Sequence, residues 1–400
     1  MNREPVLISY VIFRRFSVMV IMGVLTLSLV ANSFAMVTKI DVKIGAYYYI
    51  WWGIPFNNHW EHGVKYTPFL GKYNSSDSLT ADRHILWAKQ HGIDFFAVSW
   101  MGKGTWVDWM NTPDGSWDFD EIDWNLNYSF LKASHLQDFN FCLMYETDII
   151  LSNAIEHEKN FTKIFINDMM YAENYFEHPS YLRIDGKPVL FIYNLQYMYN
   201  ELENNTVIQL LDFLKEEINV YLVGDLGRTP PPYNVVDFLY SLDAVTSYFF
   251  AHANATEGWQ NIIKYAEEHY PKWSLMMNSH EIKFIPNAYL GYDNTEHCEW
   301  KQSQNMSCTP IVLPLNKTMF EQMLNISLNN RDENLKIVMI TSWNEWLEST
   351  AIEPSMEFGE LFLHTIYLIP EFPSALILSI FMITTLLAVI ICTRKHTSVR

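Results

Sequence analysis

The sequence predicts a (β/α)8 barrel, the TIM-barrel form of the α/β class, and three observations lead to that fold. Short apolar runs rich in β-branched and aromatic residues recur along the chain. Amphipathic segments separate these runs, which is the alternation expected of a parallel sheet wrapped by helices. No Gly-rich phosphate loop follows the first run, and the whole chain has 15 glycines. A doubly wound sheet is the alternative, and nucleotide-binding forms of it usually carry such a loop.

Eight of the runs are interpreted as strands, each short enough for a barrel. In chain order they are Ile44–Tyr49, Phe95–Trp100, Phe139–Tyr145, Val189–Tyr193, Val220–Val223, Ala244–Tyr248, Phe284–Ala288 and Ile337–Thr341. The helical patterns between them include Asp82–His91, Val207–Glu217 and Thr318–Asn329. Two polar segments, Lys103–Trp117 and Asp293–Thr309, are expected to be long loops after strands. A single catalytic domain over residues 40–366 accounts for all of these elements.

Polar and aromatic residues follow the strands, at the barrel face where chemistry gathers. Carboxylates stand after the third strand, at Glu146 and Asp148, and after the eighth, at Glu345 and Glu348. A pair of carboxylates is the usual set of catalytic residues for cleaving a glycosidic bond. The aromatic and polar residues at the same strand ends are Tyr48, Tyr49, Trp51, Trp52, His59, Trp100, Tyr193, Asn194, Tyr248, Tyr292, Trp343 and Asn344. Asp225 at the end of the fifth strand could be a further residue of this face, but its neighbours Gly224 and Gly227 favour a turn.

The composition agrees with a carbohydrate-active protein. Asp and Glu number 45 against 27 Lys and Arg, a formal charge of -18. This balance argues against a nucleic-acid partner, which needs a basic surface. Aromatic residues make up 16% of the chain. Rings that stack on sugars explain that share, and a large apolar core explains it as well.

The first 35 residues have the features of an export signal. Arg14 and Arg15 precede the apolar run Phe16–Val30, and Ser33–Ala35 has the small-x-small form of a cleavage site. Residues 1–35 are therefore expected to be a signal peptide, or else an uncleaved N-terminal anchor.

The C-terminal end has the features of a membrane anchor. Residues 374–392 are apolar, uncharged and long enough for a transmembrane helix. Arg394, Lys395 and Arg400 follow, so residues 393–400 are expected in the cytoplasm and the main domain at the cell surface. Residues 367–373 contain Pro-Glu-Phe and resemble the sorting signals of archaeal surface proteins, which a membrane sortase is thought to cut. A plain membrane-anchored ectodomain is the alternative.

Sequons and cysteines bear on the same expectation of an extracellular domain. Eight sequons lie between the two ends, at Asn74, Asn127, Asn160, Asn204, Asn254, Asn305, Asn316 and Asn325. Cys298 and Cys308 flank a polar loop and could pair as a disulfide in an oxidising compartment. Their spacing lacks the further ligands of a zinc site.

One motif connects these residues to a known family. The stretch Thr341–Pro354 resembles the signature of glycoside hydrolase family 99, whose members are endo-acting α-mannosidases and α-mannanases. The likeness extends to Tyr48–Gly53, His59-Trp60, Gly92-Ile93, Val98–Trp100, His178-Pro179, Tyr181-x-Arg183, Gly186–Pro188, Tyr193 and Gly291-Tyr292. A group of polysaccharide-biosynthesis glycosyltransferase-like proteins also carries a Trp-Asn-Glu-Trp-x-Glu motif, which stands at Trp343–Glu348 here.

The resemblance implies a role for each matching residue. Glu345 would act as a base on the sugar's own 2-hydroxyl, which attacks the anomeric carbon to give an anhydrosugar. Glu348 would protonate the departing oxygen and later activate water, so that the configuration is retained. The residues implied to bind substrate are Tyr48, His59, Trp100, Glu146, Arg183, Tyr193, Tyr248, Tyr292, Trp343 and Asn344. The resemblance implies no metal and no organic cofactor.

Two positions depart from the family signature. Leu347 stands where the family usually has His, and Ser349 stands where it usually has Gly. These changes concern linkage specificity more than reaction type. The expected function is therefore a surface-exposed retaining endo-glycosidase acting on α-mannose-type oligo- or polysaccharides. The alternatives are a glycosyltransferase-like enzyme of polysaccharide biosynthesis and a catalytically inactive glycan-binding surface protein.

Overall fold

A computed structural model describes residues 42–53, 59–103, 119–226, 237–248 and 258–367, all within one compact unit, Val42–Tyr367. The expected signal at 1–35, sorting segment from 368, apolar segment 374–392 and tail 393–400 lie outside these residues, as does most of the Lys103–Trp117 loop. Within the described ranges, no helix has the length and apolarity needed to cross a membrane.

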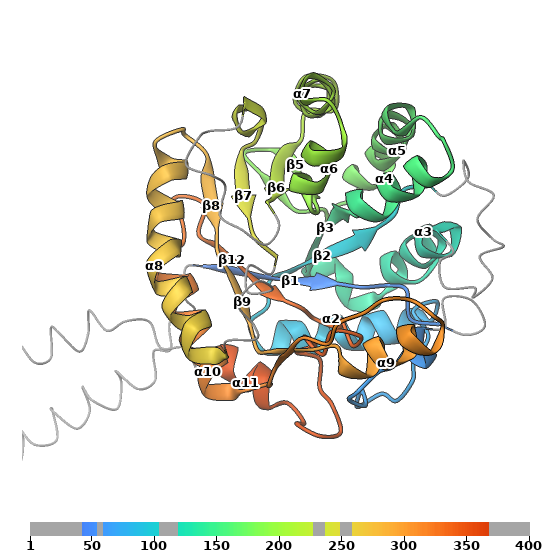
Figure 1. Cartoon of the computed structure of the whole chain (residues 1–400), viewed down its shortest axis with the longest axis vertical. Helices are drawn as coiled ribbons and strands as arrows, with labels where there is room; N and C mark the ends of the chain where they lie inside the picture. Colours follow the sequence, from blue (N-terminus) through green and yellow to red (C-terminus); the bar gives the residue numbers. More distant parts are fainter. Residues whose placement is uncertain (1–41, 54–58, 104–118, 227–236, 249–257, 368–400) are drawn as a thin grey trace, which may run out of the picture. The chain divides into compact units, whose positions relative to one another are not determined.

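Parallel strands form a barrel in the described part of the chain (Figure 1). The strands are β1 (Lys43–Tyr48), β2 (Phe95–Trp100), β3 (Asn140–Tyr145), β5 (Lys187–Ile192), β6 (Tyr221–Asp225), β7 (Ala244–Thr246), β8 (Lys283–Ile285), β9 (Asn287–Tyr289) and β12 (Ile337–Thr341). They pair in the order β8-β7-β6-β5-β3-β2-β1-β12-β9. The sheet therefore runs in chain order around the ring, as a (β/α)8 barrel requires.

The ring closes at the seventh expected strand, which Pro286 divides. β8 pairs with β7 through Val245 and Phe284, and β9 pairs with β12 through Ala288 and Ile340. Proline lacks the N–H that would continue the ladder. Its carbonyl still accepts from the Met339 N–H at 3.0 Å. The predicted barrel is thus confirmed, with one strand shared between two neighbours.

Helices surround the barrel (Figure 1). Their bounds are α2 (Ser78–Gln90), α3 (Phe119–Tyr128), α4 (Thr147–Glu156), α5 (Phe161–Phe176), α6 (Leu195–Glu201), α7 (Asn204–Phe213), α8 (Trp259–Asn278), α9 (Thr295–Ser303), α10 (Lys317–Asn329) and α11 (Leu361–Tyr367). Short strands also occur: β4 (Arg183–Ile184) precedes β5, and β10 (Tyr292–Asp293) pairs with β11 (Val312–Leu313). The expected helix Val207–Glu217 divides into α7 and a π turn at Leu214–Ile218.

Polar residues begin several of these helices where the sequence places them. Asp77 accepts from the Leu79 N–H before α2, and Asn160 accepts from Lys163 N–H before α5. Asn316 accepts from Met319 N–H before α10 in the same way. Each of these side chains satisfies an N–H that the helix itself leaves without a partner.

The barrel interior is closely packed around Gly45. A Cβ atom at this position would lie 2.3 Å from Phe95 Cζ and 2.6 Å from Met339 Sδ. These two side chains come from β2 and β12, the neighbours of β1 on either side. Glycine in β1 therefore makes room for larger interior residues from the adjacent strands.

One disulfide lies in the described residues, between Cys298 in α9 and Cys308 beyond it. The structure thus pairs the two cysteines that flank the polar loop. This bridge ties the end of α9 to the segment leading to β11. The Asp293–Thr309 segment is consequently an ordered unit of β10, α9 and a crosslink, not a plain loop.

Candidate active site

Glu345 lies in a turn directly after β12, held by the motif around it. Its N–H donates to Ser342 Oγ at 2.8 Å, and its carbonyl accepts from Thr350 N–H at 3.1 Å. Its own carboxylate accepts from Leu347 N–H at 2.9 Å. The loop therefore folds back on itself and sets the Glu345 side chain with short local contacts.

Burial gives the Glu345 carboxyl unusual acid–base behaviour. The residue is 4% exposed. Its pKa is raised well above the usual range, first by burial and then by the charge of Glu348, with a smaller contribution from Glu146. The N–H of Leu347 acts in the opposite direction. A carboxylate with a raised pKa is a stronger base, which suits proton abstraction near neutral pH.

Glu348 lies at the more open edge of the same turn and contacts β10. Its carboxylate accepts from the Tyr292 hydroxyl at 3.0 Å, and its carbonyl accepts from Asp293 N–H at 2.8 Å. The residue is half-buried, whereas Glu345 is buried. Two neighbouring carboxyls thus occupy different environments, a condition under which they can take different roles.

A third carboxylate, Glu146, enters from the end of β3. It is 3% exposed and accepts from Ser99 Oγ, at the end of β2, at 2.6 Å. Its pKa is raised well above the usual range by burial first and then by Asp148, with smaller contributions from Asp225 and Glu348. Neighbouring strand ends therefore concentrate carboxylates on one face of the barrel, as the sequence predicts.

Three tyrosines line this carboxylate cluster. The Tyr49 hydroxyl donates to the Tyr248 hydroxyl at 2.7 Å, and the Tyr193 ring meets the Tyr248 ring edge-on at 5.4 Å. Burial raises the pKa of all three hydroxyls, and carboxylates of the cluster raise them further. They are therefore neutral hydroxyls at ordinary pH and can hydrogen-bond to sugar.

Asp225 belongs to this face, although its glycine neighbours in the sequence favour a simple turn. It is 3% exposed at the end of β6. One oxygen accepts from Tyr248 N–H at 2.8 Å and the other from Asn194 N–H at 3.0 Å. Asp225 therefore joins the ends of β5, β6 and β7. The sequence signal for Asp225 is its place at a strand end, and the adjacent glycines obscure that signal.

The structure does not bring Tyr48 or Trp100 to the cluster. Tyr48 points outward from β1, stacks on Phe96 and hydrogen-bonds to His84 of α2 at 3.0 Å. The Trp100 indole N–H donates to Asp123 of α3 at 3.0 Å. Successive strand residues point to opposite faces, so Tyr49 and Ser99 take the inner positions instead.

Arg183 and Trp343 also lie away from the carboxylates. Arg183 is exposed, and its guanidinium donates to the carbonyls of Gly186 and Phe176. It stands in β4, which pairs with the start of β5 and thus lies at the opposite end of the barrel. The Trp343 ring packs on Phe96, on the outer side of the sheet. Arg183 therefore does not pair with Glu146, which stands at the other end of the barrel.

His59 and Asn344 support the strand-one end of the site. His59 is buried, with Nδ1 2.8 Å from the Trp51 carbonyl and its ring 5.6 Å from that indole. Asn344 bridges the backbone N–H and C=O of Tyr49, each at 2.8 Å. Asn344 thereby holds Tyr49, so its role is positioning.

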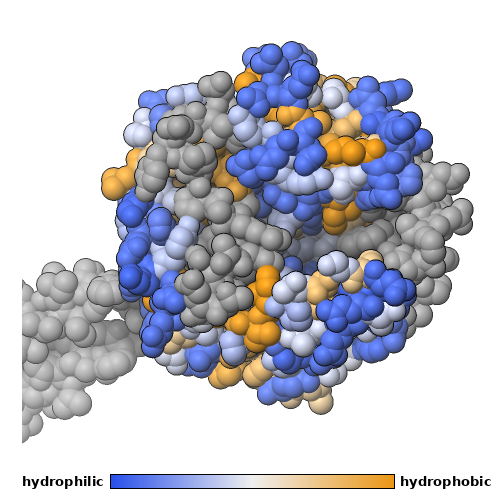
Figure 2. Space-filling model, in the orientation of Figure 1, coloured by the Kyte–Doolittle hydropathy of each residue, from blue (hydrophilic) through white to orange (hydrophobic). Residues whose placement is uncertain are grey.

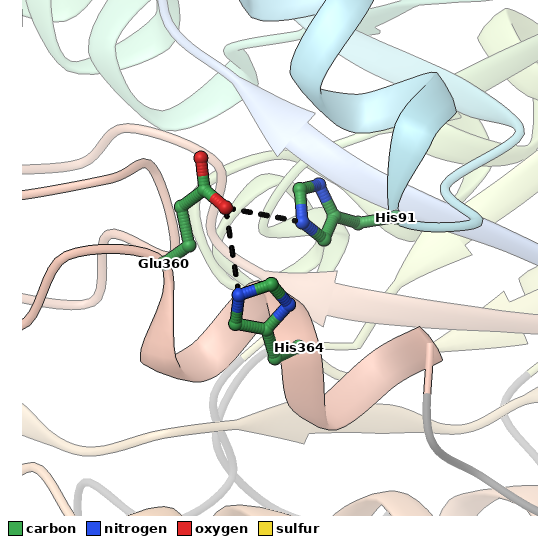
Figure 3. Close-up of side chains that lie close together, drawn as sticks. All are labelled: His91, Glu360 and His364. Carbon is green, nitrogen blue, oxygen red and sulfur yellow. Dashed lines mark ion pairs between the residues drawn. The ribbon is translucent and has the colours of Figure 1, made fainter.

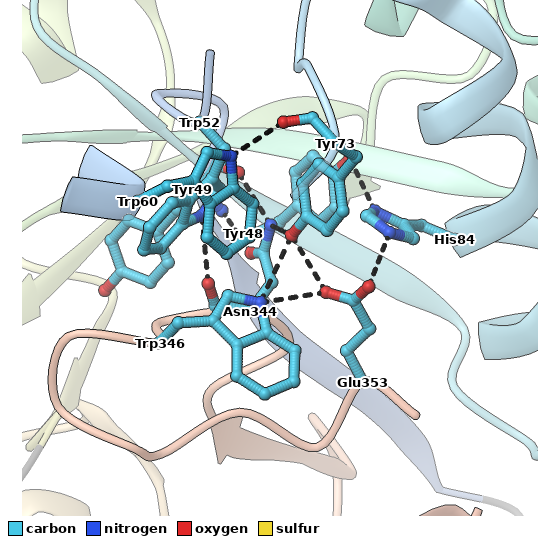
Figure 4. A network of polar contacts seen from close by, with 9 residues as sticks. All are labelled: Tyr48, Tyr49, Trp52, Trp60, Tyr73, His84, Asn344, Trp346 and Glu353. Carbon is cyan, nitrogen blue, oxygen red and sulfur yellow. Dashed lines mark hydrogen bonds and ion pairs between the residues drawn. The ribbon is translucent and has the colours of Figure 1, made fainter. Parts of the chain in front are cut away.

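A buried network lies beneath the motif loop (Figure 4). Glu353 accepts from the Tyr73 hydroxyl at 2.8 Å and from the Trp346 indole at 3.1 Å. Its other oxygen lies 3.0 Å from His84 Nε2. Asn344 Nδ2 reaches the same Tyr73 hydroxyl at 3.1 Å. The local sequence indicates no role for Tyr73, His84 or Glu353, because their contacts join segments that are distant in the chain.

The surface view shows a hollow beside this face. In Figure 2 it lies between the α4 and α6 side of the barrel and the α9 side. α4 and α6 follow β3 and β5, while α9 follows β10, so all three lie next to the strand ends that carry the carboxylates. The hollow therefore lies beside the carboxylate cluster, where a glycan could be bound.

Comparisons with known proteins identify relatives. The family described as "Glycosyltransferase WbsX" matches residues 56–366. The human glycoprotein endo-alpha-1,2-mannosidase-like protein is 22% identical over 362 residues, covering 80% of this chain and 70% of that protein. The mouse glycoprotein endo-alpha-1,2-mannosidase is 21% identical, covering 78% and 67%.

A solved structure has the same fold. The GH99 endo-alpha-mannosidase from Bacteroides thetaiotaomicron, in complex with bis-tris-propane, superposes with a TM-score of 0.58. It is 19% identical, and the superposition covers 82% of this chain and 95% of that one. At this identity the likeness concerns the barrel fold.

Proposed function

The chain belongs to the glycosyltransferase WbsX family, and we propose that it is a retaining endo-glycosidase of α-mannose-type glycans. The observation that carries the proposal is the pair Glu345 and Glu348, one buried and one half-exposed, after the last barrel strand. The names of the mannosidase relatives support the substrate class. The family description supports a second candidate, transfer of a sugar during polysaccharide biosynthesis.

The pair is suited to hold one proton between two carboxyls. Each charge raises the cost of ionising its neighbour, so like-charged carboxyls at close quarters do not both ionise readily. The pair shares one proton, and the reactive form is the one in which that proton lies on Glu348 and Glu345 is the base. The Tyr292 hydroxyl at 3.0 Å orients the Glu348 carboxyl.

The proposed reaction has two balanced steps. Glu345 takes the proton of the sugar 2-hydroxyl, whose oxygen attacks the anomeric carbon while Glu348 protonates the departing oxygen. Glu348 then takes a proton from water, which attacks the same carbon, and Glu345 returns its proton to O2. Two inversions give overall retention, and each carboxyl ends as it began.

In this proposal, Glu146 and the tyrosines around the carboxylate cluster bind and orient the sugar. Glu146 accepts hydroxyls of the reacting unit, while the ring pair Tyr193 and Tyr248 presents an aromatic wall with hydroxyl groups. Asn344 holds the backbone of Tyr49, whose hydroxyl donates to that of Tyr248. Anchoring at the cell surface through residues 374–392 remains part of the proposal and would expose the carboxylate cluster to extracellular glycans.

The test compares the full chain with its Glu345→Gln and Glu348→Gln variants on α-1,2- and α-1,3-linked mannose oligosaccharides. Glu268→Gln, an exposed helix position, is the matched control. We expect internal cleavage with retained configuration, seen by mass spectrometry and NMR, in the wild type and the control. Sugar transfer that requires an activated donor, without hydrolysis, would favour the transferase. Sugar binding without turnover in any form would favour a glycan-binding protein.

A further inference from the structure

Two histidines and a glutamate meet at a place unrelated to the carboxylate cluster (Figure 3). His91 ends α2, Glu360 precedes α11, and His364 lies one turn further along α11. His91 Nε2 and His364 Nε2 lie 3.6 Å and 3.5 Å from the same atom, Glu360 Oε2. The three ligand atoms all lie within 4.8 Å of one another.

The orientation of His91 is set by its other ring nitrogen. Nδ1 lies 2.8 Å from the Trp87 carbonyl, which can only accept, so Nδ1 carries the hydrogen. In the neutral ring this leaves the Nε2 lone pair facing Glu360. A lone pair facing a carboxylate oxygen is repulsive, and a cation held by both atoms, either a proton or a metal ion, removes the repulsion. A backbone carbonyl holding the far nitrogen is also the usual outer support of a metal-binding histidine.

Two of the three distances between ligand atoms are close to those around a small divalent cation. With metal–ligand bonds of about 2.0–2.1 Å, the ligand atoms of a tetrahedral zinc site lie about 3.3–3.4 Å apart. The two observed N···O distances, 3.6 Å and 3.5 Å, are close to that edge. Two imidazoles and one carboxylate form a donor set of the kind that zinc prefers.

The three side chains differ in how far they are exposed to solvent. The His91 side chain is 9% exposed, whereas those of Glu360 and His364 are 41% and 58% exposed. One ligand is therefore fixed in the core, and the other two admit an ion from solvent. Solvent can complete the coordination, as the three-ligand zinc sites of proteins allow.

We propose that His91, Glu360 and His364 form a structural divalent-cation site, best suited to Zn²⁺, that fastens α11 to the end of α2. α2 ends just before β2 begins, so the site lies at the end of the barrel opposite Glu345. α11 is short, and its apolar face packs on α10 through Phe362 and Phe320, with ring centroids 6.2 Å apart. The ion joins two segments far apart in the chain and holds the last described helix in place.

The test uses the full chain, free of any affinity tag and stripped with EDTA. Calorimetric titration with ZnCl2 should show one bound ion per chain. His364→Gln and Glu360→Gln change exposed side chains, so the fold should persist, and each should weaken binding more than tenfold. The matched control is His135→Gln, which removes an isolated His–Asp contact of 2.9 Å with Asp82. Its zinc binding should equal that of the wild type.

Two further measurements, a Co²⁺ absorption spectrum and a melting temperature, test the same site. Co²⁺ should give the intense visible spectrum of a four-coordinate site, and His364→Gln should abolish it. At a hundredfold excess over Kd, Zn²⁺ should raise the melting temperature by a few degrees, and His364→Gln should remove the increase. Absence of zinc binding, or equal binding by His364→Gln and Glu360→Gln, would overturn the proposal. A weak, six-coordinate Co²⁺ spectrum would do the same.

Discussion

Replacing Glu348 by Gln isolates the acid half of the proposed pair. The amide has the same size, and its oxygen can still accept from the Tyr292 hydroxyl, which now lies 3.0 Å from the carboxylate. The backbone contact from Asp293 N–H to the carbonyl of this residue, 2.8 Å, does not involve the side chain. The Glu348→Gln variant therefore loses the acidic proton, while its side chain keeps the position of the Glu348 side chain.

The expected effect follows from the role of that proton. General acid catalysis contributes about 10²–10⁴-fold. At about 1.36 kcal/mol per tenfold, this corresponds to about 2.7–5.4 kcal/mol of barrier. We expect kcat/KM on a mannose oligosaccharide to fall by that factor in Glu348→Gln. Fluoride leaves without protonation, so the same variant should be far less impaired on a matching α-mannosyl fluoride. Glu345→Gln should be inactive on both, because O2 must be deprotonated whatever departs.

The assay follows oligosaccharide cleavage by product mass and glycosyl fluoride cleavage by fluoride release. Glu268→Gln serves again as the control and should match the wild type on both substrates. A loss in Glu348→Gln below tenfold on the oligosaccharide would refute the acid assignment. Equal losses on the two substrates would refute it too, because they would mean that the residue acts through binding or structure.

The remaining predictions concern stability and are checked by unfolding measurements. Burial and nearby carboxylates raise the pKa of Glu345, so the folded chain keeps this proton to higher pH than the unfolded chain, whose ordinary Glu pKa is about 4.3. Stability is therefore lost as pH rises from there through the folded-state pKa, and Glu345→Gln should flatten that part of a melting-temperature profile; an unchanged profile would contradict this. Gly45→Ala should cost about 1–3 kcal/mol in urea unfolding, because its Cβ would lie 2.3 Å from Phe95. Glu353→Ala should cost about 3–5 kcal/mol, because it leaves His84 and two other donors buried without their acceptor. A cost within about 0.5 kcal/mol, as for a surface substitution, would contradict the steric argument for Gly45 or the hydrogen-bond argument for Glu353.

The strands could be predicted because their signal is local. β2 and β12 occupy the residues expected for them, Phe95–Trp100 and Ile337–Thr341, since both are buried on two faces and carry continuous apolar sequence. The seventh run was harder to place. Its division at Pro286 depends on pairing with two different neighbours, which a single strand's sequence does not specify.

The site could be predicted only as far as its chain order. Glu146, Glu345 and Glu348 follow barrel strands, so their shared face comes from topology alone. Tyr48 and Trp100 also stand at strand ends but point away from the cluster. Arg183, which only the resemblance implies, precedes a strand and lies at the opposite end of the barrel. Along a strand, a shift of one residue exchanges the inner and outer faces, and the aromatic character of both faces here hides the distinction.

The barrel, the strand order and the motif with its two glutamates could therefore be predicted from the chain alone, because each rests on short-range pattern and on the regular geometry of alternating strands and helices. The tertiary structure alone decided which carboxyl is buried, that Tyr49 and not Tyr48 lines the cluster, and that Glu353 joins His84. It also brought His91 to Glu360 and His364 from the other end of the domain. These features depend on contacts between segments distant in the chain, and burial and distance across such contacts have no signature in local composition.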